Sequence, residues 1–126
     1  MRLLRFLPFL AVAVVILYAG LKPEPVPQAF DQQDKLHHLL GFAALAFSMR
    51  LAFPRLRLLW VVVLCLALAV LVEVGQSYYP HRVASIADMV ANALGVAVGV
   101  ACSLVAQRAL GRWRESSAAI AASEQS

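Results

Sequence analysis

Four long apolar runs, separated by short polar breaks, constrain the fold of this chain more than any other feature. They cover approximately residues 3–21, 36–53, 58–79 and 83–107. A helix rises about 1.5 Å per residue, so each run is long enough to cross a hydrocarbon core about 30 Å thick. The composition agrees, because 62% of the residues are hydrophobic and only 14% are charged. We therefore predict an all-α polytopic membrane protein with four transmembrane helices in an up-down bundle.

The breaks between the runs divide the chain into one membrane domain and a tail. Three prolines within residues 22–27 end the first helix and begin an extramembrane loop. Pro54 ends the second run, and the following turn is so short that the second and third helices must be antiparallel neighbours. Residues 1–114 are predicted to form the domain, and residues 115–126 a disordered tail. The first run also has the length of a secretory signal, but a retained helix is favoured because its cleavage pattern is poor.

The positive charges predict how the helices are oriented. With the N-terminus inside the cell, eight cations lie on the inner side: Arg2, Arg5, Arg50, Arg55, Arg57, Arg108, Arg112 and Arg114. The outer side then holds Lys22, Lys35 and Arg82. Because cytoplasmic loops are enriched in Lys and Arg, both termini are predicted to be cytoplasmic. This flanking pattern also accounts for the net charge of +4, so no nucleic-acid partner is predicted.

Polar residues gather at the outer ends of three of the predicted helices. The set consists of Asp34, Lys35, His38, Glu73, Gln76, Arg82, Ser85, Asp88 and Asn92. Spacings of three and four residues place Glu73 and Gln76 on one helix face, and those from Ser85 to Asn92 on one face of the next helix. Ionisable groups are costly inside a membrane and usually mark functional sites. These residues are therefore predicted to form a polar binding site in the outer leaflet.

Two other interpretations of these residues are open. They can be structural, with Glu73 paired to Arg82 or Lys35, Asp88 capping the fourth helix, and the amide side chains joining helices. His38, Glu73 and Asp88 can also bind a metal ion, but no HExxH-type spacing supports that interpretation. Neither a metal nor a cofactor is therefore predicted.

Small residues recur at every fourth position of the last apolar run: Ala87, Ala91, Gly95, Gly99 and Ser103. In lipid, such a stripe lets a second backbone approach closely, and we predict Ala91, Gly95 and Gly99 as helix-packing residues. The partner is either another helix of the same chain or a second copy in a homo-oligomer. We favour the intrachain partner, because four helices joined by short loops need a packed centre.

The polar residues also match the pattern of a known family. Asp34-Lys35-x-x-His38, Glu73-x-x-Gln76 and Pro80-x-Arg82-x-x-Ser85-x-x-Asp88-x-x-x-Asn92-x-x-Gly95 resemble the VanZ-like family of small bacterial membrane proteins. The resemblance covers roughly residues 34–99, and His81 stands where the family often has a glycine. It implies a multi-pass protein of the bacterial inner membrane that acts in the cell envelope. The family takes its name from a glycopeptide-resistance protein associated with teicoplanin, so a role in antibiotic resistance is one implied function.

Two classes of function fit these expectations. In the favoured class, the protein binds or modulates an envelope component, such as a lipid-linked precursor or an amphiphilic glycopeptide, and Arg82 and Lys35 meet an anionic headgroup. In the alternative, it is a membrane-embedded hydrolase or transferase acting on a lipid-linked substrate. Glu73 or Asp88 then serves as general base and His38 as acid or base. No nucleophile-elbow or phosphate-loop motif supports catalysis, and the lipid bilayer is the predicted partner in both cases.

Overall fold

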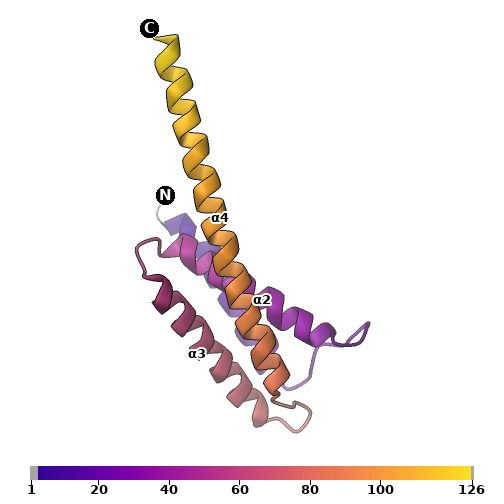
Figure 1. Ribbon diagram of the computed structural model, residues 1–126. Helices are drawn as coiled ribbons and strands as arrows, with labels where there is room; N and C mark the ends of the chain where they lie inside the picture. The colour runs from indigo at the N-terminus through magenta and orange to yellow at the C-terminus, as the bar shows by residue number, and fades with distance from the viewer. Residues whose placement is uncertain (1–2, 126) are drawn as a thin grey trace.

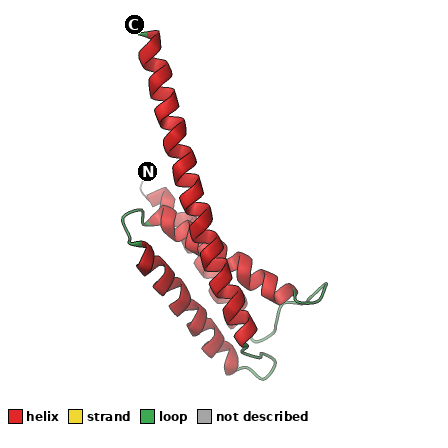
Figure 2. Cartoon of the chain, in the orientation of Figure 1, coloured by secondary structure: helices red, strands yellow, loops and turns green. Residues whose placement is uncertain are grey.

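The computed structural model describes residues 3–125, which form an all-helical chain without strands (Figures 1 and 2). A short 3-10 helix, Leu3–Arg5, leads into α1 (Phe6–Leu21), followed by α2 (Gln33–Ala52), α3 (Leu58–Ser77) and α4 (Ile86–Glu124). The predicted all-α class with four long helices is confirmed. Arg2, one of the cations used to predict the orientation, lies outside the described residues.

Successive helices run in opposite directions, as expected of an up-down bundle (Figure 1). The N-terminus and the α2–α3 turn lie at one end, and the α1–α2 and α3–α4 loops lie at the other. Within the described residues, three helical stretches are long and apolar enough to cross a membrane: Leu3–Leu21, Leu58–Ser77 and Ile86–Glu124. α2 has the same length as α3, 20 residues, but it carries ionisable groups near both ends.

α2 and α4 pack backbone to backbone, because two glycines of α4 face α2. A Cβ at Gly95 would overlap the carbonyl oxygen of Leu39 and lie 3.0 Å from its carbonyl carbon. A Cβ at Gly99 would likewise overlap the carbonyl oxygen of Ala43 and lie 3.0 Å from the Cα of that residue. The small-residue stripe thus has an intrachain partner, as predicted. Ala87 is an exception, since it is exposed at the start of α4.

The apolar core occupies the half of the bundle nearest the α2–α3 turn. Its buried members come from α2, α3 and α4 and include Phe42, Leu45, Ala46, Val61, Cys65, Ala69 and Val96. Arg50, near the end of α2, joins this half to α4, since its Nη2 donates to Gln107 Oε1 at 3.1 Å. No residue of α1 is buried, although several of its side chains pack against the core. The other half of the bundle is therefore left for the polar residues.

Several helix ends differ from the sequence-based expectation. α2 begins three residues early, after Gln32, whose φ of 61° is left-handed, so Asp34 lies in the first turn and does not cap the helix. α3 ends at Ser77, and α4 begins only at Ile86. The tail, predicted to be disordered, is helical through Glu124, while Ser126 lies outside the described residues.

Alanine explains the helical tail. Four of the six residues 117–122 are alanine, which has the highest helix propensity of all residues. Every described residue after Val105 is exposed, and this half of α4 projects beyond the other helices (Figure 1). Beyond Gln107, which accepts a hydrogen bond from Arg50, the extension is thus a helical stem held mainly by local propensity.

Candidate functional site

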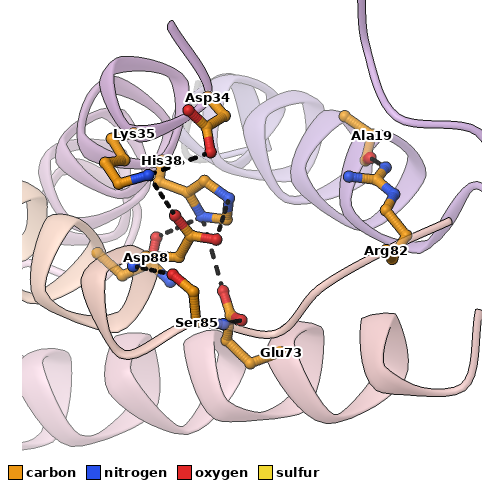
Figure 3. A network of polar contacts seen from close by, with 9 residues as sticks. Ala19, Asp34, Lys35, His38, Glu73, Arg82, Ser85 and Asp88 are labelled. Carbon is orange, nitrogen blue, oxygen red and sulfur yellow. Dashed lines mark hydrogen bonds and ion pairs between the residues drawn. The ribbon is translucent and has the colours of Figure 1, made fainter. Parts of the chain in front are cut away.

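The buried polar residues of three helices meet at the end of the bundle formed by the α1–α2 and α3–α4 loops (Figure 3). His38 comes from α2, Glu73 from α3, and Asp88 and Asn92 from α4. The side chains of Glu73 and Asp88 are each 8% exposed, that of His38 is 15% exposed, and Asn92 is fully buried. We call these four residues the His38 cluster.

The imidazole of His38 lies between the two carboxylates of the cluster. Its Nδ1–H donates to Asn92 Oδ1 at 2.9 Å, and Nδ1 also lies 4.0 Å from Glu73 Oε1. On the other side of the ring, Nε2 is 3.9 Å from Asp88 Oδ2. One titratable ring therefore contacts an acid of α3 and an acid of α4, and a hydrogen bond to a neutral amide orients it.

Glu73 also holds the start of α4 against α3. The backbone N–H of Ser85 donates to Glu73 Oε2 at 3.2 Å, and Ser85 Oγ accepts from the backbone N–H of Asp88 at 3.0 Å. The first N–H groups of a helix have no partner within the helix, and a serine at the N-cap supplies one. Ser85, not Asp88, is therefore the N-cap of α4, which leaves the Asp88 carboxylate free to face His38.

Lys35 and Asp34 form the rim of the cluster. Lys35 Nζ lies 3.5 Å from Asp34 Oδ2 and 3.8 Å from Asp88 Oδ1. Both rim side chains are about one-third exposed, at 35% and 37%. The ammonium thus reaches the cluster from its solvent side and satisfies only part of its negative charge.

Three atoms of the cluster have no hydrogen-bond partner: Glu73 Oε1, Asp88 Oδ1 and Asn92 Nδ2. An unpaired buried polar group costs free energy, and such atoms in a native fold call for a functional or ligand-based explanation. Asp88 Oδ1 has only the ion pair with Lys35 at 3.8 Å, and a purely structural network of helix-joining hydrogen bonds would not leave Glu73 Oε1 unpaired. Asn92 does join α4 to α2 through His38, so the structural interpretation holds for part of that side chain.

Arg82 lies apart from the His38 cluster. Its Nη2 donates to the carbonyl oxygens of Ala19 at 2.6 Å and Lys22 at 3.3 Å, so it caps the C-terminal end of α1 (Figure 3). The alternative pairing of Glu73 with Arg82 is therefore wrong, and Glu73 accepts from the Ser85 backbone instead. Backbone carbonyls occur at every residue, so no sequence signal could have identified these acceptors.

A cavity of about 360 Å³ opens beside the His38 cluster, between α1, the α1–α2 loop, α2 and α3. Its polar lining includes His38, Gln76 and Arg82. The apolar lining includes Val15 and Ile16 of α1, Leu40 and Phe42 of α2, and Val72 of α3. Gln76, a predicted site residue on α3, is 3% exposed and forms part of this lining. The α1 residues were not predicted, because their only signal is an apolarity they share with the whole helix.

Comparison with known proteins identifies the family. A family model described as VanZ/LLP1 matches residues 3–107, which include α1, α2, α3, the membrane-length half of α4 and every predicted site residue. No curated protein and no solved structure matches. The match ends where the exposed stem of α4 begins.

Proposed function

We propose a function from the premise that this chain belongs to the VanZ/LLP1 family: it binds an amphiphilic component of the bacterial cell envelope in the cavity beside His38. The observation that carries the proposal is a cavity of about 360 Å³ with an apolar wall and a few polar groups at one side. Ligand sites of proteins are typically mainly apolar cavities of this kind. A lipid-linked precursor and an amphiphilic glycopeptide both have the matching chemistry.

The lining suggests how such a ligand lies. Its apolar chain packs against Val15, Ile16 and Val72, and its headgroup reaches His38 and Gln76. Arg82 keeps α1 in place as a wall of the cavity through its bonds to the α1 carbonyls, so its guanidinium is already engaged.

The site lies in the outer leaflet of the bacterial inner membrane, with both termini in the cytoplasm. The bias of eight cations against three supports this orientation. The structure is compatible with it, because the N-terminus and the projecting C-terminal stem lie at the same end of the bundle (Figure 1). In this setting, altered susceptibility to a glycopeptide such as teicoplanin is the phenotype to examine.

Binding is tested by native mass spectrometry of the full chain released from nanodiscs. Gly41 lines the cavity, and a Cβ at Gly41 would make only ordinary contact with Ile16 at 3.6 Å, so Gly41→Phe extends a ring into the cavity. Wild type should retain an amphiphilic ligand and Gly41→Phe should lose it. Gly111→Phe is the matched control, because a Cβ at Gly111 would meet nothing within 4 Å. Equal retention in all three proteins would contradict the proposed cavity.

A second candidate function, a hydrolase or transferase acting on the same ligand, is favoured by the placement of His38 between Glu73 and Asp88. His38 would take a proton from an attacking hydroxyl and return it to the leaving group, while the carboxylates stabilise the charged ring. Headgroups of envelope lipids are compared by mass spectrometry in cells with and without the protein. Enzymatic function predicts a shifted composition that disappears in Glu73→Gln and Asp88→Asn, whereas simple binding predicts no shift.

A further inference from the structure

The hydrogen bond between His38 and Asn92 determines which ring nitrogen is free. Nδ1–H donates to Asn92 Oδ1 at 2.9 Å, and a neutral imidazole carries only one N–H, so Nε2 presents a lone pair. That lone pair lies 3.9 Å from Asp88 Oδ2. A lone pair and a carboxylate oxygen repel each other unless a cation lies between them.

The separation of these atoms fits a shared cation better than a hydrogen bond. The Nε2–Oδ2 distance of 3.9 Å is beyond the range of about 2.7–3.2 Å for N–H···O bonds. Two ligand atoms held at about 2.0–2.2 Å from one tetrahedral ion are about 3.3–3.6 Å apart, so the observed separation is only slightly too wide for a shared ion. One ligand atom from each of His38, Glu73 and Asp88 lies within 4.8 Å of the other two. Only a small closing movement would bring all three to one ion.

Two carboxylate oxygens without hydrogen bonds supply an independent observation, although Asp88 Oδ1 has an ion pair with Lys35. Glu73 and Asp88 are each 6% exposed when the whole residue is counted, yet Glu73 Oε1 and Asp88 Oδ1 have no hydrogen-bond partner. Glu73 Oε1 points towards the imidazole, 4.0 Å from Nδ1 (Figure 3). A buried carboxylate is normally paired or coordinates a metal. An ion in the centre of the cluster would supply the missing partner.

The charges around the cluster also favour a bound cation. Lys35 lies within ion-pair distance of Asp34 and Asp88, whereas among the described residues no lysine or arginine lies within that distance of Glu73. Arg82 does not compensate, because its guanidinium binds carbonyls of α1. Lys35 can therefore offset only part of the charge of these carboxylates, and a divalent cation would offset the remainder.

We propose that His38, Glu73 and Asp88 bind one divalent first-row metal ion of the Zn²⁺ or Mn²⁺ type. An imidazole combined with two carboxylates suits these ions, whereas Mg²⁺ and Ca²⁺ prefer oxygen ligands throughout. Asn92 is the positioning residue, because ligating histidines usually donate their other N–H to an acceptor that fixes the ring. The ion would join α2, α3 and α4, and its binding requires no envelope ligand, although His38 also lines the cavity of the proposed function.

Metal binding is tested with the full chain without a histidine tag, purified in detergent and stripped with a chelator. After equilibration with Zn²⁺ or Mn²⁺, bound metal is counted by inductively coupled plasma mass spectrometry. Wild type should bind about one ion per chain, and His38→Gln, Glu73→Gln and Asp88→Asn should each weaken binding at least tenfold. His37→Gln and His81→Gln, which change exposed histidines, should bind as wild type does.

Thermal unfolding of the wild type and of His37→Gln detects the ion even where a cluster variant folds poorly. The same metal should raise the thermal unfolding midpoint of wild type and His37→Gln, because an ion that binds only the folded state stabilises it. Absence of both binding and stabilisation in wild type would overturn the site. Loss of binding in His37→Gln or His81→Gln, or full binding in all three cluster variants, would place the ion at the surface and overturn the site as well.

Discussion

Replacing Gly95 with alanine tests the close approach of α2 and α4 directly. The added methyl group would overlap the carbonyl oxygen of Leu39 and lie 3.0 Å from its carbonyl carbon and 3.1 Å from the amide nitrogen of Ala43. All three atoms belong to the backbone of α2, so no side-chain rotation relieves the overlap. The whole of α2 must move away from α4, and the contacts on either side of Gly95 are lost with it.

The size of the effect follows from two opposing terms. Overpacking of a tight contact costs about 1–3 kcal/mol, occasionally more. Alanine is intrinsically better than glycine in a helix by roughly 1 kcal/mol, which offsets part of that cost. Gly111→Ala isolates the second term, because a Cβ at Gly111 meets nothing within 4 Å. The Gly95 and Gly111 variants should therefore differ by about 1–3 kcal/mol in the free energy of unfolding, since the gain in propensity is common to both.

The assay is reversible unfolding in mixed micelles, followed by helical circular dichroism as the denaturing detergent is increased. Because about 1.4 kcal/mol changes an equilibrium tenfold, the expected difference is readily measured. Gly111→Ala should unfold at the same or a higher detergent fraction than wild type, and Gly95→Ala at a lower one. Coinciding midpoints for the two variants would refute the backbone contact between α2 and α4.

Three further predictions concern other contacts. Arg82→Gln should lower the free energy of unfolding by about 1.5–3 kcal/mol, the usual contribution of a hydrogen bond to a charged group. It should also expose the α1–α2 loop to proteolysis, and unchanged proteolysis would contradict the cap on α1. Val90→Leu should leave abundance and unfolding unchanged, because Val90 is 53% exposed on α4 and faces away from α2; a marked loss of stability would indicate an unrecognised partner on that face. A topology reporter fused after Arg57 should be active only in the cytoplasm and one inserted near Pro25 only outside, and the reverse pattern would place the His38 cluster in the wrong leaflet.

The sequence alone determined the number and type of the helices, because lipid requires backbone hydrogen bonds to be satisfied within each segment and the apolar runs have spanning length. It also determined which faces pack. Gly95 and Gly99 are four residues apart, so they had to lie on one face of the helix. A face of small residues allows a neighbouring helix to approach closely.

Only the tertiary structure decided which polar groups meet. The separation of His38 from Glu73 and Asp88 depends on how α2 crosses the other two helices, and helical periodicity says nothing about that crossing. Arg82 shows the limit most clearly, because its acceptors are backbone carbonyls at the end of α1 and not the nearby carboxylates. A flexible side chain bonds to whichever acceptors packing brings within reach, so its partner depends on the arrangement of helices far apart in the chain.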